Sequence, residues 1–392
     1  MNKVLRIPVM IILSGLFFSC SDKKDLSFAD DVALLTEHVD DIIILSAGDA
    51  KIAVSPSMQG RIFTSTSNGM NGRSYEWYDR SLIESGEYKY SFHKIGGAGR
   101  LWFGPEAGKF SAFFEPGAEQ TAENIRISPD LTNKPFELLG SERRALSCVG
   151  RLNIRNAAGT KFSLMVNRTI KLLTREEVWI ELGIDSLNSL ACVAYQAETK
   201  IMNTDRSKWP KSKGLLSIWE LSCMHPTPNT WVIIPTRGLA ELTTYFTELP
   251  ENRVRRTADA IFYKADASYM NKIGLKPEFS KNVFGSYSQE KNLLTIVNYT
   301  LGSDSALYVN SQWGNTAPYD GDVLNIFNGE VNRAEDRNWP FYEMETSSNA
   351  QELRPGEVMS HTHTTFHFEG TRDELESIAN QVLGVSLKPL GE

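Results

Sequence analysis

From about residue 42 onward, the chain alternates short apolar stretches with clusters of Gly, Asn, Ser, Asp and Pro. Such stretches recur roughly every ten residues, a spacing typical of an antiparallel sandwich or barrel. Helix never alternates with strand in the rhythm of a parallel α/β sheet. The pattern therefore predicts an all-β fold. The clearest strand predictions are residues 41–45, 51–54, 161–166, 178–182, 230–234, 293–297 and 306–309.

Helix signals are confined to the two ends of this all-β region. Residues 28–39 carry apolar side chains near helical spacing behind Ser27, a favourable N-cap. Residues 371–384 begin with Thr371 and Glu374, the spacing of a capping box, and continue with an apolar helical repeat. We expect the second helix to pack on the sandwich as a lid or brace.

The segment around residues 342–346 shows strict period-two alternation. Tyr342 and Met344 lie on one face of the predicted strand, and Glu343 and Glu345 lie on the other. Two carboxylates on one face are either a solvated charge pair or a functional pair. A turn at Pro355-Gly356 then leads into the last predicted strand.

The N-terminus reads as a secretory signal over residues 1–19. Lys3 and Arg6 precede an apolar run over residues 7–18, and Ser19-Cys20 follows. The run is short for a membrane-spanning helix, and a small residue before Cys20 resembles the lipobox of bacterial lipoproteins. That resemblance implies a lipid on Cys20, membrane anchoring and a location in the cell envelope. The alternatives are an uncleaved anchor or an ordinary signal with a chance cysteine.

Residues 20–27 are small and charged, as expected of a solvated tether. Residues 28–392 contain no internal repeat, low-complexity tract or linker, so we predict a single β-sandwich domain there. Acidic residues directly after Cys20 also resemble the surface-export signal of some Gram-negative lipoproteins.

Composition narrows the function classes. A hydrophobic content of 41% and an aromatic content of 10% are enough to build a core. The net charge of −7, without a basic run, argues against a nucleic-acid partner. Cys148, Cys192 and Cys223 allow at most one disulfide and form no zinc pattern. Since no dinucleotide, phosphate-loop, zinc-protease or serine-hydrolase motif is present, we assign no cofactor and no metal.

A resemblance to a known family rests on residues 342–347 and on Leu353-Arg354-Pro355-Gly356-Glu357. These segments are similar to the C-terminal end of aldose 1-epimerases, in the galactose mutarotase-like superfamily. The resemblance implies a galactose mutarotase-like β-supersandwich that recognises carbohydrate. It also implies that Glu345, at the position of the family's general base, takes the proton of the anomeric hydroxyl.

The chain departs from the epimerases at the general acid. Their acid is a histidine in a mid-chain Asn-His-x-Tyr-Phe-Asn-Leu type motif, which this sequence lacks. His225 is the only mid-chain histidine. It is either the acid or an ordinary histidine of a surface loop.

The whole mature chain also resembles a family of uncharacterised bacterial lipoproteins with this fold, for which no reaction is assigned. The residues that carry this resemblance are Gly96-Gly97 to Gly108, residues 214–219, Lys272-Ile273-Gly274, Gly285-Ser286-Tyr287 and residues 308–311.

Two loop-like stretches offer substrate-binding candidates. Arg100, Trp102 and Glu106 follow a glycine-rich turn that resembles the Gly-Gly segment lining the epimerase cleft. The alternative is a tight turn with a structural Arg–Glu pair. The second stretch contains Trp313, Tyr319 and Asp320, since aromatic faces stack on pyranose rings and carboxylates bind their hydroxyls. Because Asp322 follows two residues later, calcium or simple turn chemistry is the alternative there.

His361, His363 and His367 share one face of the last predicted strand. Alternate histidines on a strand can hold a metal, and outward-facing histidines on an edge strand give the same pattern. No third ligand type is indicated, so we assign no metal to them.

Three functions compete for this sequence. The first is an epimerase or related sugar enzyme with Glu345 as base and with Arg100 and His225 as positioning or acid groups. The second is a non-catalytic glycan-binding lipoprotein that uses Trp102, Trp313 and Tyr319. The third is a structural or partner-binding envelope protein. If a sugar binds, we expect the candidate residues to converge on the concave face of the larger sheet.

Overall fold

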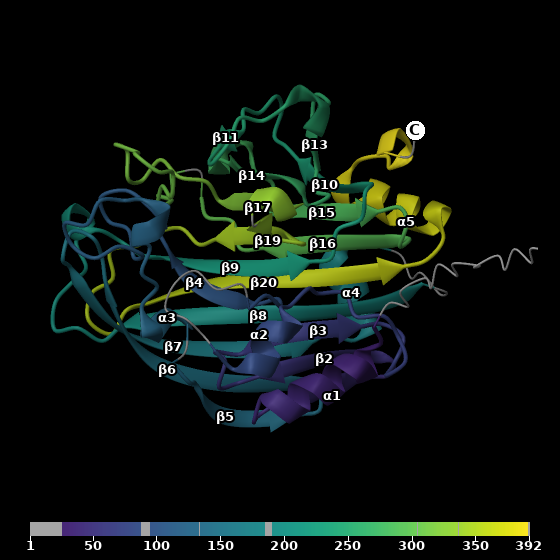
Figure 1. The fold of residues 1–392 in the computed structure, drawn as a ribbon, viewed down its shortest axis with the longest axis horizontal. Helices are drawn as coiled ribbons and strands as arrows, with labels where there is room; N and C mark the ends of the chain where they lie inside the picture. The colour runs from purple at the N-terminus through teal and green to yellow at the C-terminus, as the bar shows by residue number, and fades with distance from the viewer. Residues whose placement is uncertain are drawn as a thin grey trace, which may run out of the picture.

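The computed structural model describes residues 26–87, 95–132, 134–184, 190–303, 305–335 and 337–390. Within these ranges the strands form three antiparallel sheets (Figure 1). The predicted signal peptide and Cys20 lie outside the described residues. No helix in the described part of the chain has the length and apolar character needed to cross a membrane.

The largest sheet has ten strands and forms one layer of the sandwich. In spatial order the strands are β12 (Val254–Arg256), β13 (Ala260–Lys264), β10 (Thr230–Pro235), β15 (Val283–Ser288), β16 (Leu293–Tyr299), β20 (Val358–Glu369), β8 (Ala191–Asn203), β7 (Lys161–Leu172), β6 (Ala145–Arg155) and β5 (Glu137–Glu142).

A seven-stranded sheet forms the second layer. Its spatial order is β11 (Thr243–Thr244), β14 (Ser268–Leu275), β17 (Leu324–Asn332), β19 (Tyr342–Ser347), β9 (Ser217–Met224) and β4 (Arg100–Gly104), with β18 (Arg337–Asn338) paired to β17. The third sheet is the meander β1 (Ile43–Ala47), β2 (Ala50–Ser55) and β3 (Arg61–Thr66).

Five α-helices occur within the described residues. They are α1 (Phe28–His38), α2 (Arg80–Ser85), α3 (Pro129–Thr132), α4 (Arg175–Leu182) and α5 (Arg372–Ile378), which continues into η6 (Ala379–Leu383). As expected, Ser27 caps α1 and Thr371 caps α5 in a capping box with Glu374. Leu375 and Ile378 of α5 are buried against the ten-stranded sheet, so α5 acts as a brace.

The apolar core lies between the two large sheets. Met344, Ile326 and Ile273 of the seven-stranded sheet pack against Val232 and Phe284 of the ten-stranded sheet. These side chains point away from the opposite face of the seven-stranded sheet because successive residues of a strand alternate. That opposite face is left for polar and aromatic side chains.

A polar layer also crosses the interior between the two large sheets. Arg168 of β7 donates to both carboxylate oxygens of Glu220 on β9, at 3.0 and 2.9 Å. It also donates to the carbonyls of Gln59 and Gly99, each at 2.7 Å. Because both side chains of the ion pair are fully buried, this pair fixes how the sheets sit on each other.

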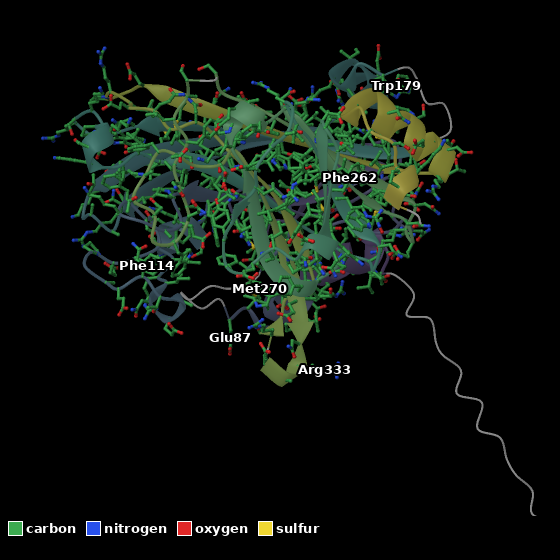
Figure 2. All side chains as sticks on the ribbon, turned by 90° about the horizontal axis from the view of Figure 1, so that it is seen from above. Glu87, Phe114, Trp179, Phe262, Met270 and Arg333 are labelled. Carbon is green, nitrogen blue, oxygen red and sulfur yellow. The ribbon has the colours of Figure 1, made fainter. Side chains whose placement is uncertain are left out.

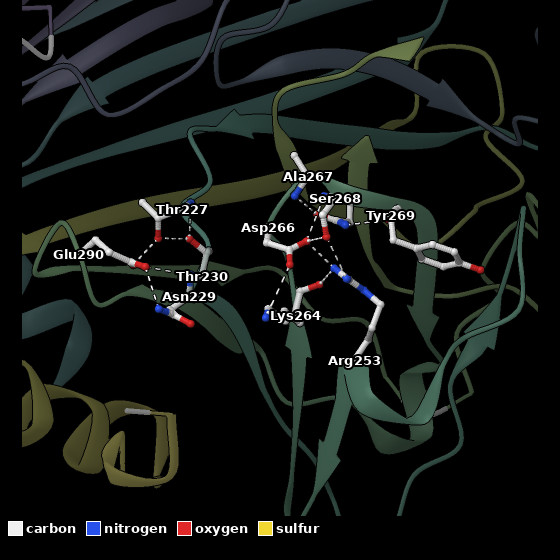
Figure 3. A network of polar contacts seen from close by, with 11 residues as sticks. Thr227, Asn229, Thr230, Arg253, Lys264, Asp266, Ala267, Ser268, Tyr269 and Glu290 are labelled. Carbon is white, nitrogen blue, oxygen red and sulfur yellow. Dashed lines mark hydrogen bonds and ion pairs between the residues drawn. The ribbon is translucent and has the colours of Figure 1, made fainter. Parts of the chain in front are cut away.

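A second polar network holds the turn that leads into β14 (Figure 3). Arg253 donates to Asp266 at 2.6 Å and to the carbonyl of Lys264 at 2.9 Å. The same Asp266 oxygen accepts from the backbone N–H of Ser268 at 3.0 Å. These bonds fix the point at which β14 starts, and hence the side chains that β14 presents.

Two strand predictions are wrong. Residues 178–182 belong to α4, because Thr174 and Glu177 form a capping box and Gly183 ends the helix in a left-handed conformation. Ile180 is 74% exposed there, which a strand core would not allow. Residues 306–309 form only isolated bridges, because no neighbouring strand extends the pairing. Helices are also not confined to the ends, since α2, α3 and α4 lie within the β region.

Candidate functional site

The outward face of the seven-stranded sheet carries a pocket of about 510 Å³. Aromatic and charged side chains dominate its lining. They are Arg100, Trp102, Glu106, Trp219, Tyr245, Phe246, Lys272, Trp313, Phe327, Trp339 and Glu343, together with Ala122, Ile125, Leu221 and Met270. We expected the candidate residues to converge on the concave face of the larger sheet, and this expectation is wrong. The inner face of the ten-stranded sheet is packed against the other layers.

Strand register explains why residues distant in sequence meet at this pocket. Arg100 on β4 is opposite Leu221 on β9, which is opposite Glu345 on β19, which is opposite Asn325 on β17. Residues in such a row share one face of the sheet. Four separate segments thus supply one continuous floor.

Lys272 lies at the centre of that floor, and Glu345 lies directly beneath it. The Lys272 ammonium lies 2.9 Å from Glu345 Oε2 and 3.6 Å from Glu106 Oε2. Trp219 donates its indole N–H to the same Glu345 oxygen at 2.9 Å, and the Lys272 nitrogen lies 4.6 Å from the centre of the Trp219 ring. Glu345 itself is fully buried behind these two side chains.

Burial tunes the protonation of this pair. Loss of solvent raises the pKa of Glu345 to about 7, although the Lys272 ammonium acts in the opposite direction. Burial opposes the charge on Lys272, but the carboxylates of Glu345 and Glu106 outweigh it and raise the pKa of the ammonium. The floor therefore holds a carboxyl whose pKa lies near neutrality beside a lysine that is protonated at neutral pH.

A second ion pair lies beside the first. Arg100 Nη2 is 3.3 Å from Glu343 Oε1, and the guanidinium stacks 4.1 Å from the centre of the Trp102 ring. The Cys223 thiol also donates to Glu343 at 3.2 Å, and burial raises the pKa of that thiol. Arg100 and Glu343 are thus held in place while still facing the pocket.

A third polar group borders the floor at Asp322. Its carboxylate accepts from the Tyr245 hydroxyl at 2.6 Å and from Thr243 at 2.9 Å, and burial raises the pKa of Asp322 to about 6. Asn325 donates to the same Tyr245 hydroxyl at 3.1 Å. Gly274 leaves room for the Asp322 carboxylate, because a Cβ at position 274 would lie 2.1 Å from an Asp322 oxygen.

Of the residues singled out in the sequence, five are brought together. Arg100, Trp102, Glu106 and Trp313 line the pocket, and Glu345 lies directly beneath it. Trp313 also reaches Glu106 Oε1 with its indole N–H at 3.3 Å. The alternative of a merely structural Arg–Glu pair does not describe Arg100 and Glu106, because they bind different partners.

Three predicted site residues are not in the pocket lining. His225 follows the end of β9 and is absent from that lining. Tyr319 donates its hydroxyl to the carbonyl of Lys211 at 2.6 Å, and exposed Asp320 is paired with Lys276 at 2.7 Å. Loop composition identified Tyr319 and Asp320, but the loop directs these two side chains to other partners.

Lys272, Trp219, Tyr245 and Trp339 were missed as site residues by sequence reasoning. Lys272 stands in a strand-like stretch, where a single lysine usually signals a solvated face. Its place in the pocket follows from the pairing of β14 with β17, a relation that one sequence does not reveal.

The three histidines of β20 lie in the interior, so the edge-strand interpretation is wrong. β20 is flanked by β16 and β8, and His361 and His363 both bond the hydroxyl of Thr346, at 2.8 and 2.9 Å. His367 lies 2.9 Å from Glu76. Across the described residues, no group of three His, Cys, Asp or Glu side chains is placed to hold a metal ion.

Comparison with known proteins places the chain in a family. Residues 26–392 match DUF6786, a family of unknown function. The chain belongs to the DUF6786 family. No curated protein matches the DUF6786 chain in sequence.

Solved structures share the fold of the DUF6786 chain at low identity. A candidate aldose 1-epimerase from Escherichia coli gives a TM-score of 0.51 at 12% identity, over 83% of this chain and 98% of that one. The Slr1438 protein from Synechocystis gives 0.51 at 12%, over 84% and 96%. A candidate mutarotase from Salmonella typhimurium gives 0.50 at 10%, over 85% and 92%. The predicted galactose mutarotase-like β-sandwich is confirmed.

Proposed function

We propose that this DUF6786 protein binds a sugar in the pocket and interconverts its anomers by general acid–base chemistry. Glu345 is the base and Lys272 is the acid. The observation that carries the proposal is the contact between Glu345 and Lys272, 2.9 Å apart at the floor of an aromatic pocket. The likeness of the fold to structures described as aldose 1-epimerase and mutarotase candidates supports the same chemistry.

The composition of the lining supports a sugar as the ligand. Trp102, Trp219 and Trp313 offer flat apolar surfaces for the C–H face of a pyranose ring. Arg100 and Glu106 offer donors and acceptors for its hydroxyls. A concave site with an apolar lining and a few convergent polar groups is the usual form of a small-molecule site.

The proposed reaction balances in protons. The Glu345 carboxylate takes the proton of the anomeric hydroxyl while the Lys272 ammonium gives a proton to the ring oxygen. The bond between the anomeric carbon and the ring oxygen breaks, which leaves an open-chain aldehyde. Rotation of the aldehyde and the reverse steps give the other anomer and return both protons.

One observation favours a second function, non-catalytic glycan binding. Glu345 is fully buried and is not part of the pocket lining, so a sugar contacts it only after Lys272 or Trp219 moves aside. A pocket that keeps this pair closed would bind a glycan without turnover.

One experiment separates the two functions. The mature domain is screened on a glycan array, and each hit is assayed for anomer exchange by NMR with wild type and Glu345→Gln. We expect binding to survive in Glu345→Gln while exchange falls at least 100-fold. Glu137→Gln, on the exposed strand β5, is the matched control. Binding without exchange in wild type would establish the second function, and no binding by any glycan would refute both.

We also propose that the protein is a lipid-anchored lipoprotein of the cell envelope. The sequence of residues 1–27, with its apolar run, Cys20 and charged tether, supports this address. In the expressing bacterium, a labelled fatty acid should be incorporated into the wild-type chain and not into Cys20→Ala. Equal labelling, or a Cys20→Ala chain that still sediments with membranes, would refute the anchor.

A further inference from the structure

One part of the pocket lining is apolar. Phe246, Met270, Phe327 and Trp339, which we call the aromatic shelf, line the same pocket as Lys272. They come from the loop after β11, from β14, from β17 and from the segment between β18 and β19. None of the four side chains is charged, and Phe327 is paired with Lys272 on one side and Glu343 on the other, so the shelf offers apolar surface directly beside the charged floor.

Ring contacts hold the aromatic shelf in place. The Phe246 and Phe327 rings lie 6.4 Å apart at 76°, and the Phe327 and Trp339 rings lie 5.7 Å apart at 67°. Such edge-to-face contacts fix ring orientations. Phe246 nevertheless stays 44% exposed and Trp339 is half-buried, so the shelf keeps accessible aromatic surface next to the floor.

The size of the pocket also exceeds the need of one sugar. About 510 Å³ is within the range of roughly 300–1,000 Å³ that holds drug-sized ligands, which are larger than a single pyranose. The floor alone supplies the hydrogen-bonding groups that one sugar residue requires. A monosaccharide bound at the floor would therefore leave the shelf without a ligand contact.

We infer that the ligand is the reducing end of a glycan with at least two sugar residues. This inference rests on the proposed function. Chemistry at Glu345 and Lys272 needs a free anomeric hydroxyl, which a glycan has only at its reducing end. That residue therefore occupies the floor, and the residue next to it stacks on the aromatic shelf with few hydrogen bonds of its own.

The test compares anomer exchange for glucose, galactose and mannose with exchange for 1,4-linked disaccharides that have these sugars at the reducing end. For the preferred sugar we expect kcat/KM to be about 10-fold higher for the disaccharide, the effect of about 1.4 kcal/mol of stacking. Trp339→Ala and Phe246→Ala should each move this ratio toward one. Trp179→Ala is the matched control, because Figure 2 places Trp179 far from Met270 of the shelf and the ratio should stay unchanged.

The outcomes distinguish the shelf from the floor. Exchange of monosaccharides and disaccharides with equal kcat/KM, unaffected by Trp339→Ala, would overturn the shelf and leave the proposed function standing. If Trp179→Ala lowers the ratio of disaccharide to monosaccharide kcat/KM as much as Trp339→Ala does, the role of the shelf would also be overturned. Absence of exchange and binding for every sugar would refute the proposed function and the shelf with it.

Discussion

Lys272 controls the charge of the pocket floor, because its ammonium contacts both Glu345 and Glu106. If Glu345 is the base, kcat/KM for anomer exchange should rise about tenfold per pH unit up to about pH 7 and then level off. Lys272→Met removes a cation that lowers the pKa of Glu345, so the midpoint of the profile should move to higher pH. The rate at the plateau should fall by about 100-fold or more because the acid is lost.

The pH–rate profiles of wild type, Lys272→Met and Lys272→Arg test this assignment. Lys272→Arg keeps the charge, so its midpoint should stay near that of wild type. A wild-type profile that is flat across pH 7, or a midpoint that moves down in Lys272→Met, would contradict the roles given to the pair.

The Arg168–Glu220 pair makes a prediction about stability. Both side chains are fully buried, and Arg168→Met would leave the Glu220 carboxylate without its cation. We expect the free energy of unfolding to fall by about 3–5 kcal/mol, as measured by urea denaturation. Arg151→Met on the neighbouring strand β6, where the side chain is exposed, should change it by less than about 0.5 kcal/mol. If Arg168→Met and Arg151→Met lower the free energy of unfolding equally, the buried ion pair does not contribute to stability as we expect.

Single residues were predictable where a local motif marks them. Strand alternation and the family resemblance singled out Glu345, which lies beneath the pocket, and Glu343 two positions earlier shares its face. Lys272 was not singled out, because its place in the pocket depends on the register between β14, β17 and β19. Asp320 and Tyr319 were misplaced because side chains in a loop choose partners that composition does not encode.

At the scale of elements, strand β14 depends on the turn that Arg253 and Asp266 hold. Burial opposes ionisation of Asp266, but hydrogen bonds from Arg253 and Ser268 outweigh it and lower the pKa of the carboxyl. A lowered pKa means that the contribution to stability is present above the unfolded value near 4 and is lost as the pH falls below it. Asp266→Ala should therefore reduce the free energy of unfolding by about 1–3 kcal/mol at pH 7.

The pH dependence of that difference is the check. Urea midpoints of wild type and Asp266→Ala should approach each other as the pH is lowered from 7 to about 3. A gap that stays constant over this range would show that the ionised carboxylate of Asp266 does not stabilise the turn.

Elements were predictable where capping and periodicity agree. Both end helices were found because Ser27 and Thr371 mark their starts. Helix α4 was missed because Val178 and its neighbours resemble a strand, while the capping box at Thr174 was overlooked. Residues 306–309 have strand-like composition and no partner strand, and pairing decides the outcome.

At the scale of the whole molecule, buried histidines couple the sandwich to pH. Burial lowers the pKa of His361 and of His363 to about 3, from an ordinary value near 6.5. Within the described residues, His361 Nδ1 and His363 Nε2 have no hydrogen-bond partner that could support a charge. The unfolded chain takes up these protons below about pH 6.5 and the folded chain does not, so stability is complete above that pH and falls toward pH 3.

Urea denaturation at pH 7.5 and at pH 5 measures this coupling. Each histidine should contribute up to about 1.4 kcal/mol per pH unit to the loss. The double variant His361→Gln with His363→Gln should be less stable at pH 7.5 and should lose less on acidification. His38→Gln, at an exposed position on α1, is the control and should keep the wild-type dependence. A steep loss that persists in the double variant would assign the effect to other groups.

The fold class of the whole molecule could be predicted from strand spacing and from the resemblance at residues 342–347. The order of the strands in the sheets could not be predicted from either. β20 lies in the middle of the ten-stranded sheet although it comes last in the described strands, so its histidines face inward rather than toward solvent. The choice between the sheets as a binding face also depends on which layers cover each one, and that is a property of the assembled sandwich.

The aromatic lining gives the protein an optical property of its own. The chain has eight tryptophans, and four of them, Trp102, Trp219, Trp313 and Trp339, line the one pocket. Indole emission depends on the polarity and the charges around the ring, and Trp219 already borders both Lys272 and Glu345. Any molecule that displaces water from this pocket should therefore change the intrinsic fluorescence of the protein. Ligand binding can then be followed by tryptophan emission without a label.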